Sequence, residues 1–212
     1  MGRAAYRAAR PGDIRAVAFD LDDTLWDVGP VIVRAEERLH EWLREHCPRI
    51  VERVSREEMR AARERLARSE PHHAHDFTYL RLTALAAHAR ECGYGQEVAQ
   101  LAFRVFFAAR NELKPYADVQ PALERLRARY TLASLSNGNA DFELIGLAPL
   151  FSLSLNARQI GAAKPHPRCF QHLARDLRLA PWPPHLEPAD FDVADCLQLA
   201  ELLALGPGSC QG

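Results

Sequence analysis

VAFDLDDTLWD, residues 17–27, is the stretch that decides the fold of this chain. A short apolar run at residues 16–19 leads into it, which is typical of a fully buried β-strand. Polar side chains follow at once, namely Asp20, Asp22 and Thr24. An acidic residue at the carboxyl end of a buried parallel strand lies where open α/β sheets bind their ligands. The stretch therefore predicts an α/β fold with a functional site at that edge of the sheet.

Two carboxylates that are two residues apart can divide the work of a hydrolytic reaction. Asp20 can attack as a nucleophile and can also bind a hard cation, while Asp22, just past the strand, can donate and accept a proton. Carboxylate nucleophiles suit phosphoryl transfer, because the aspartyl-phosphate that they form is readily hydrolysed. A solvated acidic turn after a strand is the alternative interpretation, and it is common for an isolated D-x-D pattern.

Two segments further along the chain favour the catalytic interpretation. The apolar run at residues 131–135 predicts a second buried strand, and it ends in Ser136-Asn137-Gly138. A hydroxyl group and exposed backbone N–H groups in such a turn can hold phosphoryl oxygens. Lys164 follows a third short strand at residues 151–155, and its charge can neutralise both a carboxylate nucleophile and a bound phosphoryl group. Taken singly, an Asn-Gly turn and a solvated lysine are ordinary features.

Together, these segments resemble three motifs of the haloacid dehalogenase (HAD) superfamily: Asp20-x-Asp22-x-Thr24, Ser136-Asn137-Gly138 and Lys164-Pro165. The resemblance runs from about residue 14 to residue 179. It implies a three-layer Rossmann-like α/β core with a parallel sheet, and an inserted all-α cap of the C1 type. It places the core at residues 1–28 and 115–212 and the cap at residues 29–114. It also implies Mg²⁺ as the cofactor with Asp20 and Asp22 as metal ligands, and a phosphate held by Thr24, Ser136, Asn137 and Lys164.

The segment between the first two motifs has the pattern of four helices. Apolar residues recur at helical spacing up to Pro48, and Ser55-x-x-Glu58 is a capping box that predicts the start of a second helix. Residues 76–91 and 97–113 predict two more helices, and four such helices make a small bundle. In the superfamily resembled, a cap at this position closes over the active site and helps to select the substrate. We therefore expect His75, Asp76 and Arg81 to contact the substrate.

After residue 179 the sequence departs from the superfamily pattern. An apolar strand ending in Gly-Asp is expected there, with acids that complete the magnesium site, but residues 181–188 contain four prolines. Proline does not fit a central strand, so one strand-helix unit is expected to be missing. Its loss would leave the first strand with an unpaired edge, which invites self-association. Three acids could replace the metal ligand, namely Asp190, Asp192 and Asp195. Alternatively, Asp190 and Asp192 could cap a turn or a helix start.

Composition narrows the class of protein. Hydrophobic residues are 48% and charged residues 26% of the 212 residues, which is ordinary for a soluble globular protein. The net charge of −1 shows no bias toward nucleic acid, and no apolar segment has the length of a membrane span. The five cysteines are scattered, which indicates reduced thiols in the cytoplasm. We expect a cytoplasmic monomer or homodimer whose partner is a small phosphorylated metabolite.

The predicted function is Mg²⁺-dependent hydrolysis of a phosphate monoester through an aspartyl-phosphate. The segments around Asp20, His75 and Ser136 are most similar to a bacterial subgroup of the superfamily, which is associated with flavin mononucleotide (FMN) and a phosphorylated ribitylaminouracil of riboflavin synthesis. A 2-haloacid dehalogenase is one alternative, although Asp22 argues against it because a departing halide needs no proton. A truncated, catalytically defective protein that acts at most as a binding protein is the other, and the missing unit is its motivation.

Overall fold

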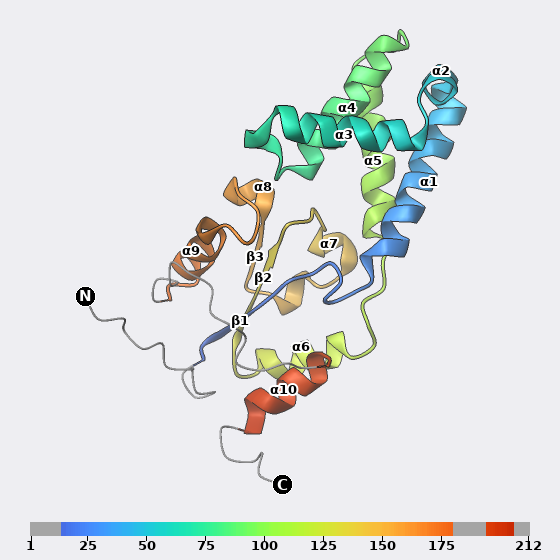
Figure 1. Cartoon of the computed structure of the whole chain (residues 1–212). Helices are drawn as coiled ribbons and strands as arrows, with labels where there is room; N and C mark the ends of the chain where they lie inside the picture. The colour runs from blue at the N-terminus through green and yellow to red at the C-terminus, as the bar shows by residue number, and fades with distance from the viewer. Residues whose placement is uncertain (1–13, 180–193, 206–212) are drawn as a thin grey trace, which may run out of the picture.

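A parallel three-stranded sheet lies at the centre of the molecule, with its strands in the order β1-β2-β3. The computed structural model describes residues 14–179 and 194–205 (Figure 1). The strands are β1 (Ala16–Phe19), β2 (Thr131–Ser136) and β3 (Leu153–Asn156). The α-helices are α1 (Val28–His46), α2 (Pro48–Arg53), α3 (Arg56–Ser69), α4 (Phe77–Glu91), α5 (Glu97–Asn111), α6 (Val119–Arg127), α7 (Phe142–Ile145), α8 (Ala157–Ile160), α9 (Pro167–Asp176) and α10 (Cys196–Leu205). Two 3₁₀ turns, η2 (Pro71–His73) and η3 (Ala148–Leu150), complete the described elements.

The register of the sheet brings the polar segments together. Phe19 lies beside Ser134, and Ser136 lies beside Asn156. Because all three strands run in the same direction, their carboxyl ends meet at one edge. The loops that follow β1 and β2 therefore begin next to each other, as the sequence predicts.

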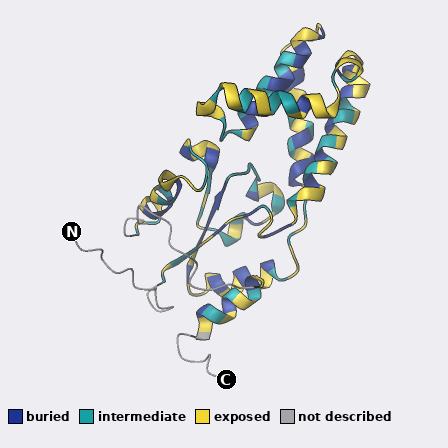
Figure 2. Cartoon of the chain, in the orientation of Figure 1, coloured by how far each residue is buried: buried dark blue, intermediate teal, exposed yellow. Residues whose placement is uncertain are grey.

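Side chains of β2 serve two helical layers. Leu132 belongs to a hydrophobic cluster with residues of α6 and α10, whereas Ala133 and Leu135 belong to a cluster with residues of α8 and α9. Successive side chains of a strand point to opposite faces of the sheet, so this one strand contributes to both layers. Figure 2 shows the buried residues gathered along these contacts. The predicted α/β fold with a parallel sheet is confirmed.

The first strand is less buried than the sequence predicts. Ala18 is exposed, and Ala16 and Val17 are only half-buried. Among the described residues, β1 pairs with β2 alone and forms one edge of the sheet. The prediction of a fully buried strand is therefore wrong. The expected loss of a neighbouring strand concerns residues outside the described ones and stays a prediction.

The helices between β1 and β2 bury a hydrophobic cluster of their own. Its buried members all lie between Ala35 and Ala109. Helix α1 packs along α5, and α4 packs against α3 and α5. Helix α2 was not predicted, because Pro48 was interpreted as the end of the preceding helix, although proline also fits the first turn of a new one. The assignment of residues 29–114 to a cap and of the remainder to a core stays a prediction.

Within residues 14–179 and 194–205, no helix combines the length and apolar character that are necessary for crossing a lipid bilayer.

Candidate active site

The loop that follows β1 is anchored by apolar side chains. Leu21, Leu25 and Trp26 are almost completely buried in the hydrophobic cluster that also includes residues of α6. The backbone turns tightly between them, because the N–H groups of Thr24 and Leu25 both donate to the carbonyl of Leu21. Asp23 takes a left-handed backbone conformation within this turn (φ 60°). Fixing the apolar residues inward leaves the intervening acids on the outer side of the loop.

The acids of this loop have different surroundings. Asp23 and Asp27 accept hydrogen bonds from the first N–H groups of α1, at 3.0 Å from Val28 and 3.1 Å from Gly29. They therefore cap a helix whose N–H groups would otherwise lack partners. Asp20 is different, because its side chain is 46% exposed and its Oδ1 lies 2.7 Å from the Lys164 Nζ. Of these three acids, Asp20 is the one whose carboxylate contacts a lysine.

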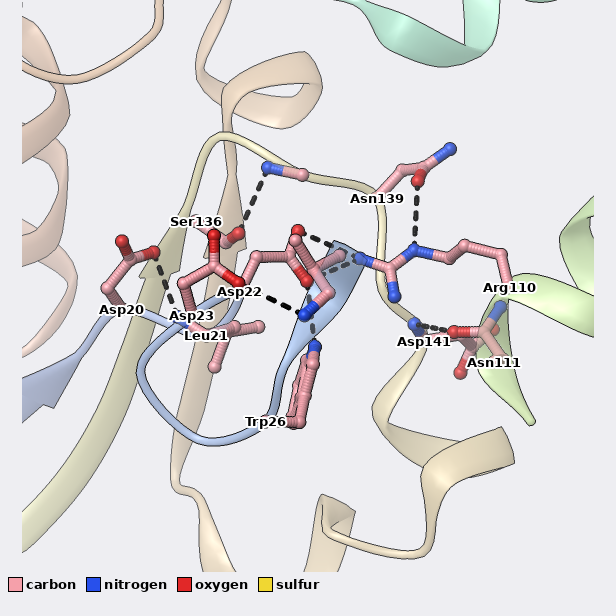
Figure 3. A network of polar contacts seen from close by, with 12 residues as sticks. Asp20, Leu21, Asp22, Asp23, Trp26, Arg110, Asn111, Ser136, Asn139 and Asp141 are labelled. Atoms are coloured by element: carbon pink, nitrogen blue, oxygen red, sulfur yellow. Dashed lines mark hydrogen bonds and ion pairs between the residues drawn. The ribbon is translucent and has the colours of Figure 1, made fainter. Parts of the chain in front are cut away.

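Asp22 is held on two sides (Figure 3). The indole Nε1 of Trp26 donates to its Oδ1 at 2.8 Å, and the Nη2 of Arg110 lies 2.8 and 2.9 Å from its two oxygens. Its side chain is 25% exposed, whereas that of Arg110 is 1% exposed. The carboxylate is thus fixed by three short contacts while one part of it still faces outward.

The turn after β2 lies against Asp22. The Ser136 hydroxyl accepts a hydrogen bond from the Gly138 N–H at 3.0 Å, which leaves the hydroxyl proton available to another acceptor. A methyl group added to Gly138 would overlap with the Oδ2 of Asp22, and it would lie 3.4 Å from the Ser136 Oγ. Only a residue without a β-carbon allows this close approach. The loops after β1 and β2 therefore form one site, as the sequence predicts.

Asn137 positions Lys164. Its Oδ1 accepts a hydrogen bond from the Lys164 N–H at 2.7 Å, and its Nδ2 donates to the Lys164 carbonyl at 3.1 Å. The amide thereby holds the backbone of the lysine whose ammonium group reaches Asp20. This contact gives Asn137 a role beside the phosphate contact that the sequence predicts. Thr24 lies on the turn after Asp22, where it is exposed.

The described residues were expected to include ligands for magnesium. This ion prefers oxygen ligands and often completes its shell with water and substrate phosphate. The accessible carboxylate of Asp20 suits it, but no group of three Asp, Glu, His or Cys side chains gathers as a metal site within the part of the chain that the structure describes. Asp190 and Asp192 lie outside the described residues. Asp195 accepts the Gln198 N–H at 2.7 Å in the first turn of α10, a capping role that was not predicted from the sequence for this residue.

Comparison with known proteins identifies the family of this chain. The family model described as a haloacid dehalogenase-like hydrolase matches residues 14–185. The chain belongs to the haloacid dehalogenase-like hydrolases. It is 32% identical over 164 residues to the 5-amino-6-(5-phospho-D-ribitylamino)uracil phosphatase YigB of Escherichia coli (strain K12), with 75% of this chain and 68% of that protein covered.

Solved structures of haloacid dehalogenases share the fold of this hydrolase. The crystal structure of 2-haloacid dehalogenase from Pseudomonas syringae pv. Tomato DC3000 is 31% identical, has a TM-score of 0.81, and covers 90% of this chain and 98% of its own. The L-2-haloacid dehalogenase from Xanthobacter autotrophicus is 26% identical with a TM-score of 0.51, over 80% of this chain and 67% of its own. The relatives therefore include both a phosphatase and dehalogenases.

A cavity of about 610 Å³ opens beside the loop that follows β2. Asn137 and Gly138 form part of its wall, although Asp20 and Lys164 do not. Five phenylalanines also line it: Phe77, Phe103, Phe107, Phe142 and Phe151. The rings of Phe142 and Phe151 are stacked, with centroids 4.7 Å apart. Such walls suit a flat, partly apolar group.

Two of the three predicted substrate contacts reach this cavity. His75 and Asp76 line it, and the Asp76 Oδ2 lies 3.3 Å from the Nε of Arg158, which lines it as well. Arg81 instead lines a smaller cavity of about 280 Å³ among the helices between β1 and β2, which are called the helical insert below. There it is paired with Glu36 at 2.8 Å, and burial lowers the pKa of its guanidinium to about 10. The contact of these residues with a substrate stays a prediction.

Sequence reasoning missed three residues of the site. Arg110, Trp26 and Asn139 all belong to the polar network around Asp22 (Figure 3). The Nε of Arg110 donates to the Asn139 Oδ1 at 3.3 Å, and the Asn139 Nδ2 donates to Thr78 of α4 at 3.1 Å. An arginine within an amphipathic helix carries no signal of such a role, because its partner Asp22 lies 88 residues away in the sequence.

Proposed function

We propose that this hydrolase cleaves the phosphate monoester of a small metabolite through an aspartyl-phosphate on Asp20. The carrying observation is the contact of 2.7 Å between the exposed carboxylate of Asp20 and Lys164, next to the Ser136 hydroxyl and the anchored carboxylate of Asp22. This set combines a nucleophile, a cation, a hydrogen-bond donor and a proton carrier, which are the parts that phosphoryl transfer requires.

The reaction would occur in two steps. An Asp20 oxygen attacks phosphorus, the ester P–O bond breaks, and the departing alcohol oxygen takes a proton from Asp22. Asp22 then takes a proton from water as the water oxygen attacks phosphorus, and the bond between phosphorus and Asp20 breaks. Inorganic phosphate is released and both carboxyl groups return to their starting states. Lys164 and the Ser136 hydroxyl offset the charge of the phosphoryl oxygens throughout.

Mg²⁺ belongs to this proposal as the cofactor. When bound, it would supply further positive charge at the phosphoryl group, and the Asp20 carboxylate and the Asp22 backbone carbonyl are the groups that would hold it. Because the described residues bring no third acid to this place, we expect weak binding, with activity that is lost on treatment with a chelator and restored by added Mg²⁺.

The substrate proposed is a metabolite with a flat ring, such as FMN or a ribitylaminouracil phosphate. The curated relative YigB is named for such a substrate. The phenylalanine-lined cavity beside Asn137 and Gly138 supports a flat leaving group in this chain as well. The proposed compartment is the cytoplasm, since the four described cysteines are free and buried, as in proteins that are kept reduced.

The test is hydrolysis of p-nitrophenyl phosphate and of FMN, with Mg²⁺ and with a chelator. We expect Asp20→Asn to lose at least about 1,000-fold in kcat, because removal of a nucleophile leaves no covalent route. Asp23→Asn is the matched control, since its Oδ1 only caps α1 and asparagine can still accept that bond; it should stay within about threefold of the parent. Full turnover by Asp20→Asn would refute the mechanism.

A dehalogenase is the second candidate, favoured by the 31% identity and TM-score of 0.81 to the enzyme from Pseudomonas syringae. Asp20 would then attack carbon and expel a halide. Because a departing halide needs no proton, Asp22 would have no role as a proton donor. Release of chloride from 2-chloropropionate without Mg²⁺, in the absence of phosphatase activity, would establish this candidate instead. A soluble, folded protein that performs neither reaction would support the defective alternative.

A further inference from the structure

Arg110 has a position that overall stability does not explain. It lies in the last turn of α5, and its side chain is 1% exposed. Its Nη1 is buried and has no hydrogen-bond partner among the described residues. A buried guanidinium with an unpaired nitrogen is costly, and replacing a buried ion pair with apolar residues is often neutral or stabilising. Such an arrangement suggests a role other than stabilisation.

The contacts of Arg110 single out one oxygen of Asp22. Oδ1 accepts hydrogen bonds from both the Trp26 indole N–H and Arg110. Oδ2 accepts one from Arg110 alone among the described donors. Oδ2 is also the oxygen that lies against Gly138, beside the Ser136 hydroxyl. Oδ2 is therefore the oxygen with remaining hydrogen-bonding capacity on the side where the turn after β2 would hold a phosphoryl group.

We propose that Arg110 is the positioning residue of the proton carrier, and that it fixes the Oδ2 of Asp22 where the proton passes to the leaving alcohol and is later taken from water. This inference rests on the proposed phosphatase function, and it adds a residue and an atom to it. Proton transfer by a carboxyl group depends on its distance and orientation, and a misplacement of about 1 Å can cost about 100-fold in rate.

The same arginine links this atom to the helical insert. Its Nε donates to Asn139, which in turn donates to Thr78 at the start of α4. The neighbouring Asn111 accepts the Asp141 N–H at 2.8 Å. The ends of α4 and α5 are thus both connected to the loop after β2, so the position of the insert sets the position of Asp22.

Leaving-group dependence separates this role from a structural one. Phenol is a weaker acid than p-nitrophenol, so its departure from phosphorus depends more on a proton from the enzyme. The value of kcat/KM reports the steps up to the departure of the leaving group. For Arg110→Gln we expect kcat/KM to fall about 100-fold with phenyl phosphate and about threefold with p-nitrophenyl phosphate. Arg110→Lys keeps the charge and should recover part of the loss. Arg104→Gln, an exposed arginine on the same helix, should change neither value.

A double-mutant cycle with Asp22→Asn completes the test. If Arg110 acts through Asp22, the double variant should be no slower than Asp22→Asn alone. Equal losses with both esters, or additive losses in the double variant, would overturn the inference. Should Arg110→Gln fail to fold, the ratio of the two esters for Arg110→Lys decides in the same way. A parent protein that cleaves neither ester would instead refute the proposed function itself.

Discussion

At the scale of single residues, the surroundings decide what each acid of the first loop does. Asp23 and Asp27 are used by the first turn of α1, whereas Asp20 faces Lys164 and Asp22 is held by Arg110 and Trp26. The sequence shows four carboxylates within eight positions. The three-dimensional contacts assign two of them to the fold and leave two for chemistry.

His88 gives a residue-scale prediction for stability against pH. It is buried on α4, neither ring nitrogen has a partner among the described residues, and burial lowers its pKa below the usual 6.5. As the pH falls, the unfolded chain therefore protonates at this position before the folded chain does. The contribution of His88 to stability is complete above about pH 6.5 and is lost as the pH falls below that value. We expect His88→Leu to lose less stability than the parent between about pH 7.5 and 5.5.

Urea unfolding at both pH values measures this difference. Replacement of the exposed His72 by glutamine serves as the control and should leave the pH dependence unchanged. An identical pH dependence for His88→Leu and the parent would show that His88 is not the group responsible.

At the scale of elements, the start of α3 is the best-defined helix signal in the chain. The Ser55 Oγ accepts the Glu58 N–H at 3.2 Å, and the Glu58 Oε2 accepts the Ser55 N–H at 2.7 Å. Ser55→Ala should cost about 1 kcal/mol in the free energy of unfolding, since it removes the partner of a helix N–H group. Ser69→Ala, at the exposed end of the same helix, should cost less than about 0.5 kcal/mol. Urea titration followed by circular dichroism compares the two, and equal costs would contradict the prediction.

Local patterns explain which elements could be predicted. The capping box of α3 and the apolar run of β2 act over a few residues, and both elements were found where the sequence places them. The short helices α7 and α8 were missed, because four residues are too few to show a helical period.

The candidate site shows the same limit. Asp20, Asp22, Ser136 and Lys164 could be named because each follows a strand or belongs to a short motif. Arg110 could not be named, because its role depends on where α5 ends relative to Asp22. The exposure of Ala18 also escaped prediction, since an apolar run alone does not tell whether a strand has neighbours on one side or on two.

At the scale of the whole molecule, apolar packing stabilises the helical insert and the sheet separately, and polar contacts connect them. Each has its own buried apolar cluster, while the hydrogen bonds described above between α4, α5 and the loops of the sheet are polar contacts. The pair of Asp76 and Arg158 spans the cavity between them, and the Arg158 side chain is 60% exposed.

Arg158→Gln should therefore affect substrate binding more than stability. Because the Arg158 end of the ion pair is open to solvent, the pair should contribute about 0–1 kcal/mol, and the melting temperature should change little. We expect the KM for FMN to rise about tenfold with little change in kcat, as for a lost contact that binds ground state and transition state alike. Arg168→Gln, an exposed arginine at the start of α9, should change neither quantity. A large fall in melting temperature with an unchanged KM would assign the pair a purely structural role.

The pairing of β1 with β2 has a consequence for the order in which the chain folds. Ala16 pairs with Thr131, and all the helices of the insert lie between these two residues in the sequence. Closing so long a loop costs entropy before any strand contact repays it, whereas the helices of the insert gain their contacts from nearby residues. The insert should therefore gain protection from hydrogen exchange first, and the carboxylates of the site should come together only in the last stage, when the sheet closes around them.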